Sequence, residues 1–215
     1  MIDLSQIEKG IPTALLIRHS EREHLPEKVH DITEPLNNSG EKKAMELGEM
    51  LHDYAKKIQI ISSPVGRCIQ TGKAILRGFG TIGDIIESSY LGEPGPFVLD
   101  RDKGLFTFTQ LYSCFEVVEL QCKNSYLDGF RTQKDGTEYL ISYVCSMLQE
   151  TPPDTLMIFI SHDACLAPIL GYYTGEIFRK GYWLDFLDGS VIQQYNDKFL
   201  FKRNGKSYEI QKRIC

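Results

Sequence analysis

The sequence of 215 residues predicts one α/β domain, a three-layer α/β/α sandwich around a mostly parallel central sheet with antiparallel strands near the C-terminus. Apolar runs typical of buried strands alternate with helical periodicity, an order that favours parallel strands covered on both faces. Later strand-like runs are separated by the turn signals Asp188-Gly189, Asn196-Asp197 and Asn204-Gly205, which predict an antiparallel meander. No repeat or linker divides the chain, so we expect a single domain over residues 1–215.

The N-terminal third contains two predicted strand–helix pairs. The continuous apolar run 13–17 predicts a strand buried on both faces. A helix is expected to start at Asn38 or Ser39, and its apolar positions recur every three or four residues: Ala44, Leu47, Leu51, Tyr54 and Ile58. Residues 58–61 predict a second strand. The two serines and the proline at 62–64 predict the start of a helix that runs to about Leu76.

The rest of the chain continues this alternation. Residues 82–87 predict a third strand and residues 105–122 a helix, and a further helix is expected to open at Asp135. Residues 155–160 (TLMIFI) have the strongest strand pattern, and residues 163–173 predict the helix that follows. The inserted segment 79–134 lies between two core motifs. Its aromatic side chains are expected either to face a ligand as a lid or to pack a second small core: Tyr90, Phe97, Phe106, Phe108 and Tyr112.

Composition excludes several functional classes. Lys and Arg number 24 against 29 Asp and Glu, and a net charge of −5 disfavours a broad nucleic-acid surface. No apolar run approaches the roughly 18 residues of a membrane span. The N-terminus lacks the pattern of a secretory signal, and the six dispersed cysteines contain no C-x-x-C pair. We therefore expect a cytoplasmic protein with reduced cysteines and without membrane or nucleic-acid partners. The oligomeric state stays open.

Polar residues follow three of the predicted strands directly. Arg18 and His19 come after the first, Arg67 lies just beyond the second, and His162 and Asp163 come after the strongest. Because ligands of α/β sheets bind beyond the carboxyl ends of the strands, these side chains are expected to converge. Arginine forks and helix N-termini together suit a phosphate group.

Simpler interpretations stand beside this one. A histidine after a strand is more often a capping or core group than a catalytic one. Arg67 could be solvated, although a cation in the first turn opposes the helix dipole, and Asp163 could be only a helix cap. Arg18 is harder to explain in that way because an unpaired buried cation is costly.

Four segments resemble the signature motifs of the histidine phosphatase superfamily, also called phosphoglycerate mutase-like. Residues 16–21 (LIRHSE) resemble its R-H-G motif, with serine at position 20 where glycine is usual. Residues 36–44 resemble L-T-x-x-G-x-x-Q-A, residues 62–71 resemble S-S-P-L-x-R-x-x-Q-T, and residues 161–163 match the second histidine motif. The motifs occur in family order, so the resemblance implies a phosphoglycerate mutase-like fold and phosphate-ester chemistry.

The resemblance also implies roles for individual residues. His19 would be the nucleophile that forms a phosphohistidine, Arg18, Arg67 and His162 would bind the phosphoryl oxygens, and Arg22 would be a further clamp. Arg22 and the His162-Asp163 pair resemble the acid-phosphatase branch. The second-arginine motif and Leu91-Gly92-Glu93 resemble the mutase and fructose-bisphosphatase branch, which takes its acid from this loop. Glu93 is therefore the first candidate for the general acid, and Asp163 is the second.

The resulting hypothesis is a phosphomonoesterase for a small phosphorylated metabolite. The arginines would take the place of a cation, so no metal or other cofactor is expected. One alternative is a phosphoglycerate mutase-type phosphotransferase that uses the same phosphohistidine. Another is a non-catalytic phosphate-binding module, because Ser20 departs from the motif.

Overall fold

The computed structural model describes residues 1–24, 32–152, 154–211 and 214. Its strands form one seven-stranded sheet: β1 (Thr13–Arg18), β2 (Lys57–Ser62), β3 (Ile85–Glu87), β4 (Thr155–Ser161), β5 (Gly189–Tyr195), β6 (Lys198–Arg203) and β7 (Lys206–Ile210). The order across the sheet is β3-β2-β4-β1-β5-β6-β7. The first four strands in that order pair in parallel, and β5, β6 and β7 continue the sheet in antiparallel pairs.

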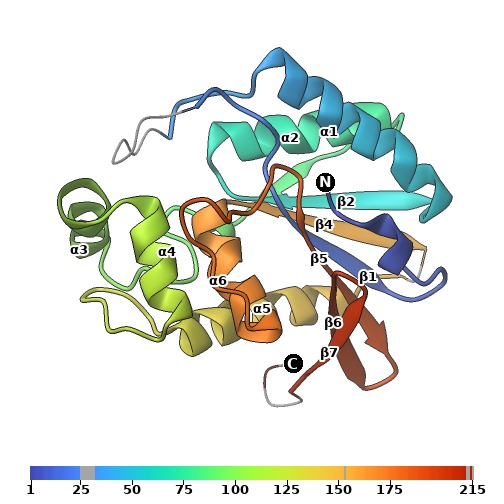
Figure 1. Cartoon of the computed structure of the whole chain (residues 1–215). Coiled ribbons are helices and arrows are strands. Elements are labelled where there is room, and N and C mark those ends of the chain that lie inside the picture. The colour runs from blue at the N-terminus through green and yellow to red at the C-terminus, as the bar shows by residue number, and fades with distance from the viewer. Residues whose placement is uncertain (25–31, 153, 212–213, 215) are drawn as a thin grey trace.

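Helices cover both faces of this sheet (Figure 1). Its α-helices are α1 (Asn38–Met50), α2 (Gly66–Gly78), α3 (Arg101–Phe106), α4 (Cys114–Cys122), α5 (Gln133–Gln149) and α6 (Asp163–Thr174). α1 and α2 lie on one face, whereas α5 and α6 lie on the other, with α3 and α4 beside them (Figure 1). The predicted three-layer architecture, its mostly parallel centre and its antiparallel C-terminal strands are confirmed.

Alternation along the central strand explains the two layers. In β1, Ala14 and Leu16 belong to the core shared with α4, α5 and α6, whereas Leu15 and Ile17 belong to the core shared with α1 and α2. All four side chains are 0% exposed. A continuous apolar run is what a strand buried on both faces requires, because successive side chains point to opposite faces.

Several predicted boundaries are wrong. α1 ends at Met50 and continues only as a short 3-10 turn, so Tyr54 lies beyond the helix and Ile58 lies in β2. α2 begins at Gly66 without a side-chain cap, so the serines at 62 and 63 are not its caps. β3 covers only three of the six residues predicted as strand at 82–87.

The predicted helix 105–122 is divided in two. A π-helical turn over 107–111 follows α3, and the chain becomes extended at Tyr112. α4 then restarts with a capping box, in which Ser113 accepts from the Glu116 backbone N–H while the Glu116 carboxylate accepts from the backbone N–H of Ser113. A local cap therefore overrides the apolar periodicity that connects the two halves.

The aromatic residues of the inserted segment have different environments. Tyr90 stacks on Tyr143 with ring centroids 4.3 Å apart and packs against the main core. Phe97 and Phe108 line a cavity, whereas Phe106 and Tyr112 are exposed. The segment thus contributes both to the core and to the wall of a cavity.

Two further expectations concern cysteines and membranes. Cys68, Cys114, Cys122 and Cys165 are free thiols, but Cys145 is disulfide-bonded. The expectation of reduced cysteines is therefore wrong at Cys145. None of the helices in the described part of the chain combines the length and the apolar character needed to cross a membrane.

Candidate functional site

The predicted polar residues converge where three parallel strands end. β1, β4 and β2 lie side by side, and Arg18 pairs with Ser161 at the end of the register. The His19 backbone N–H donates to the Ser161 carbonyl at 2.9 Å, which continues this pairing by one residue. The imidazole rings of His19 and His162 consequently lie with their centroids 5.5 Å apart. The two histidines predicted from separate motifs are neighbours.

Arg67 joins the two histidines. It lies in the first turn of α2, and its Nε–H donates to Nε2 of His19 at 3.1 Å. Its Nη2 lies 3.3 Å from Nδ1 of His162. The guanidinium is nearly buried, at 9% exposure. The alternative of a solvated Arg67 is therefore wrong, because the side chain points into the protein between the two rings.

His19 is held in one tautomer. Its Nδ1 lies 2.7 Å from the carbonyl oxygen of Ser20, and because a carbonyl only accepts, Nδ1 carries the hydrogen. Nε2 therefore has the free lone pair, which in this structure accepts from Arg67. Burial lowers the pKa of His19 well below its usual value, and the positive charges of His162, Arg18 and Arg67 lower it further. His19 is a neutral base at physiological pH.

His162 is positioned by close contacts with Ser63 and Gly92 at the Nε2 edge of its ring. Its Nε2 lies 2.9 Å from the hydroxyl oxygen of Ser63, which leaves the sheet at the end of β2. Gly92 lies at the same edge of the ring: a Cβ at that position would be 2.5 Å from the Ser63 hydroxyl and 2.8 Å from both Nε2 and Cδ2 of His162. Only a residue without a side chain fits here.

Asp163 is an ion-pair partner in this structure. Its Oδ2 lies 2.6 Å from Nη2 of Arg18 and also accepts from the indole N–H of Trp183 at 3.1 Å. Burial raises the pKa of Asp163, but the charge of Arg18, with His19 and the Trp183 hydrogen bond, outweighs burial and holds the pKa below its usual value. Asp163 is thus a carboxylate at neutral pH, which makes it a poor proton donor.

Arg18 is held from three directions. Besides the ion pair with Asp163, it donates to the Leu184 carbonyl and lies over the Phe186 ring, with Cζ 4.0 Å from the ring centroid. It is 7% exposed. The buried cation that the sequence made hard to explain therefore has a partner, and that partner is another predicted site residue.

A cavity of about 160 Å³ opens beside these groups. Its wall includes five of the predicted site residues: Arg22, Arg67, Glu93, His162 and Asp163. His19 and Arg18 are not part of the wall. Arg67, which does line the cavity, donates to His19 Nε2 and so connects the cavity wall to this ring.

Glu93 and Arg22 face the cavity from its outer parts. Glu93 Oε2 lies 2.7 Å from Nη2 of Arg101, whose side chain is 73% exposed. Arg22 donates from Nη1 to the Glu23 carbonyl, and within the described part of the chain its buried Nε has no hydrogen-bond partner. Burial and the charge of Arg67 lower the pKa of Arg22, although a guanidinium stays protonated in proteins. Arg22 therefore offers an unused donor near the cavity.

The arrangement suits a phosphate group. Arg67, Arg22 and His162 can donate to an anion in the cavity, and α2 and α6 begin at its wall, so their dipoles favour negative charge there. Within residues 1–24, 32–152, 154–211 and 214, no three His, Cys, Asp or Glu side chains form a cluster that could hold a metal ion.

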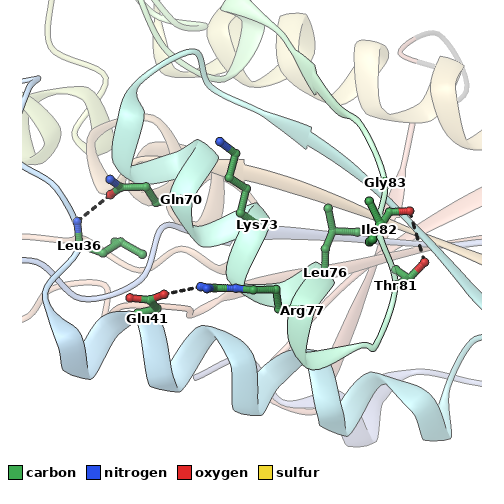
Figure 2. Close-up of a pocket in the computed structure, with 9 residues that line it drawn as sticks. All are labelled: Leu36, Glu41, Gln70, Lys73, Leu76, Arg77, Thr81, Ile82 and Gly83. Atoms are coloured by element: carbon green, nitrogen blue, oxygen red, sulfur yellow. Dashed lines mark hydrogen bonds and ion pairs between the residues drawn. The ribbon is translucent and has the colours of Figure 1, made fainter.

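A larger cavity lies elsewhere on the protein. It measures about 480 Å³ and lies between α1, α2 and residues 81–83, which lead from α2 to β3 (Figure 2). Glu41 and Arg77 form an ion pair along it, and the Gln70 side chain accepts from the Leu36 backbone N–H at 2.9 Å. None of the predicted site residues lines it. Size alone therefore does not identify the site.

Sequence reasoning missed several residues that shape the site. Ser63 and Gly92 both lie within the motifs described above. Ser63 directly follows a predicted strand and Gly92 directly precedes Glu93, and these positions were the signals that could have marked them as site residues. Trp183 and Phe186, which hold Asp163 and Arg18, lie in a segment without regular structure that carries no motif. Their approach depends on tertiary packing, so no local pattern marks them.

The sequence comparisons agree with the motifs. Residues 14–93 match the sequence model of the histidine phosphatase superfamily (branch 1). The predicted resemblance to that superfamily is confirmed. No protein with curated annotation matches the chain in sequence.

Solved structures share the fold at low sequence identity. A mycobacterial glucosyl-3-phosphoglycerate phosphatase in complex with inorganic phosphate is 14% identical, with a TM-score of 0.55 and coverage of 91% of this chain and 97% of that one. Bacillus stearothermophilus YhfR is 16% identical, with a TM-score of 0.54 and coverage of 92% and 94%. A phosphoglycerate mutase from Bacillus anthracis is 13% identical, with a TM-score of 0.52 and coverage of 92% and 91%. These neighbours share the fold of this chain, and the family match supports phosphatase or mutase-type activity.

Proposed function

We propose that the protein is a metal-independent phosphomonoesterase that acts on a small phosphorylated metabolite through a phosphohistidine at His19. The observation that carries the proposal is the neutral His19 whose Nε2 lone pair faces Arg67 and His162 beside a shared cavity. The structural neighbour named as a glucosyl-3-phosphoglycerate phosphatase supports a small phosphate ester as the substrate.

The first step follows from the position of Arg67. When the phosphate group enters, Arg67 leaves His19 Nε2 and donates to the phosphoryl oxygens, together with His162 and Arg22. Nε2 then attacks phosphorus, the bond from phosphorus to the ester oxygen breaks, and the leaving oxygen takes a proton. The Ser20 carbonyl accepts from Nδ1–H and so supports the positive charge that develops on the ring.

The second step returns the enzyme to its starting state. Water attacks the phosphohistidine, the N–P bond breaks, and His19 is again neutral when phosphate leaves. The group that gave its proton to the leaving oxygen is now a base that can take one from the water. The proton donor therefore regains its proton within one turnover.

Glu93 is the better supported proton donor of the two predicted candidates. Both carboxyl groups line the cavity, but the ion-pair partner of Glu93 is the exposed Arg101, whereas Asp163 is held as a carboxylate by the buried Arg18 and by Trp183. A group whose pKa lies below its usual value is the wrong partner for protonating an alkoxide. We therefore assign the acid role to Glu93 and a positioning role on Arg18 to Asp163.

The proposed function is tested with phenyl phosphate. We expect inorganic phosphate to be released, with little transfer to an added alcohol, and an alkaline denaturing quench to trap phosphate on His19. Predominant transfer to the alcohol would identify a phosphotransferase instead. Protein that binds phosphate but neither releases nor retains it from the ester would be a binding module.

Replacing Glu93 by glutamine is expected to separate substrates by their leaving groups. Glu93→Gln should lower kcat for an alkyl phosphate by about 10²–10⁴-fold, because an alkoxide needs a proton. Hydrolysis of p-nitrophenyl phosphate should change little, since that leaving group departs as a stable anion. The matched control is Glu119→Gln, which breaks the surface pair of Glu119 with Lys123. Equal losses on both substrates would show that Glu93 only orients the site.

Adding one methyl group at Gly92 is expected to displace His162. A Cβ there meets the Ser63 hydroxyl and the His162 ring, so one of them has to shift. Gly92→Ala should lower kcat by about 10²-fold, the effect of a displacement of about 1 Å in a catalytic group. Gly66→Ala is the control, because a Cβ at Gly66 has nothing within 4 Å. Unchanged rates in Gly92→Ala would contradict the expectation that the methyl group displaces the His162 ring.

A further inference from the structure

The cavity that contains the phosphate-binding residues has a second, apolar part. Its wall there comes from the inserted segment 79–134 and includes Phe97, Val98, Phe108 and Phe130. Phe97 and Phe130 are 4% and 8% exposed, and the rings of Phe108 and Phe130 meet edge to face with centroids 5.7 Å apart. These contacts fix the aromatic surface beside Arg67 and His162 before any ligand binds.

One buried polar group interrupts this apolar wall. Gln121 of α4 is 3% exposed and lines the same cavity, and its side-chain Nε2 has no hydrogen-bond partner among the residues that the structure describes. By contrast, the buried amide of Gln133 donates to the Pro168 carbonyl at 2.8 Å. A buried donor without an acceptor is costly and uncommon in folded proteins. Gln121 therefore offers a donor that a ligand in the cavity can satisfy.

The dimensions limit what fits. An apolar cavity of about 150 Å³ is enough for one benzene ring, and this cavity has about 160 Å³. An adjoining cavity of about 260 Å³ shares Glu93, Pro94 and Phe108 with it and reaches the exposed side chains of Arg101 and Leu105. One ring alone would fill the inner cavity, so a phosphate and a ring together have to extend past Glu93 into the adjoining cavity.

We infer that the substrate is a phosphate monoester whose alcohol carries one ring and a hydrogen-bond acceptor. The ring would lie against Phe97, Phe108 and Phe130, and the acceptor would bind Nε2 of Gln121. This inference rests on the proposed function for the identity of the phosphate end. The apolar part of the cavity and the Gln121 amide indicate which class of alcohol the ester contains. They favour ring-bearing esters over open-chain polyol phosphates.

Binding of phosphonates, which cannot be hydrolysed, tests the substrate class without any turnover. We compare benzylphosphonate, 4-acetylbenzylphosphonate and 3-hydroxypropylphosphonate by titration calorimetry on the wild-type protein. Benzylphosphonate should bind at least about 10-fold more tightly than the open-chain compound, because its ring buries apolar surface. The acetyl oxygen should add a further gain of about 10-fold by accepting from Gln121. Equal affinities across the three compounds would overturn the inference.

Gln121→Met separates ligand recognition from a structural role. The variant should lose the gain from the acetyl group, yet its urea midpoint should rise, because a side chain of similar shape replaces an unpaired buried amide. Gln110→Met, an exposed glutamine in the same inserted segment, should alter neither quantity. A Gln121→Met protein that is less stable and keeps the acetyl preference would assign Gln121 to packing and refute its role as a donor.

The two proposals fail in different ways. If ring-bearing phosphonates bind preferentially but no phosphate ester is hydrolysed, the proposed hydrolase activity is wrong and the ligand class stands. If phosphate is released from esters but ring-bearing and open-chain phosphonates bind alike, the hydrolase activity stands and the substrate class is wrong.

Discussion

His19→Ala is expected to lower kcat for phenyl phosphate by about 10⁴-fold or more, because it removes the atom that bonds to phosphorus. The same variant should retain no phosphate after the alkaline quench. His52→Ala is the matched control: His52 is exposed and stacks on Phe79 with centroids 4.4 Å apart, on the α1 side of the protein. Residual turnover close to wild type in His19→Ala would place the nucleophile elsewhere.

The pH dependence of kcat/KM gives a second measurement on the same residue, because it reports pKa values of the free enzyme. The pKa of His19 lies well below its usual value of about 6.5, so the neutral, nucleophilic form persists as the pH falls through that value. Only at a lower pH should His19 take a proton and lose its lone pair. We expect kcat/KM to stay level through pH 6.5 and to fall in more acidic buffer. A loss of activity centred at pH 6.5 or above would contradict the buried neutral imidazole.

Asp163→Asn is expected to destabilise the protein by about 3 kcal/mol, because it leaves the buried guanidinium of Arg18 without its counter-charge. The free energy of unfolding in urea at pH 7 measures this loss. Asp128→Asn is the control, since the pair of Asp128 with Lys103 is exposed on both sides and should contribute little. Wild-type stability in Asp163→Asn would mean that Arg18 does not depend on this carboxylate.

The pH dependence of this stability difference has a definite sign. The pKa of folded Asp163 is lowered, so its stabilising contribution is complete above the unfolded value of about 3.9 and is lost as the pH falls through the folded pKa. The difference between wild type and Asp163→Asn should therefore be full at neutral pH and shrink in strong acid. A difference that shrinks already between pH 7 and pH 5 would point to another titrating group.

The layers, and the convergence of the polar residues at one edge of the sheet, could be predicted from the sequence because both depend on local signals that repeat. An apolar run such as 13–17 fits a strand covered on both faces, and polar residues directly after such strands have to meet at one edge of a parallel sheet. That logic brought His19, Arg67 and His162 together, and the structure places them in contact.

What the sequence missed depends on contacts between distant residues. The 105–122 prediction failed at Ser113, where a capping box is stronger than the surrounding apolar pattern. Ser63 was interpreted as a helix cap, but its hydroxyl lies against His162, a residue 99 positions away. Gln121 lay inside a predicted helix with no feature to distinguish it from a surface glutamine. In each case the deciding partner comes from elsewhere in the fold.

Ser20, the residue that departs from the family motif, shows what that motif requires physically. Its hydroxyl donates to the Gly40 carbonyl at 2.6 Å and its backbone N–H donates to the Thr71 hydroxyl, so the side chain ties the loop after β1 to the start of α1. Its side chain is fully buried. The position therefore accepts a small side chain, and a hydroxyl there has a carbonyl acceptor within reach. A family motif that allows serine as well as glycine at this position would include this chain.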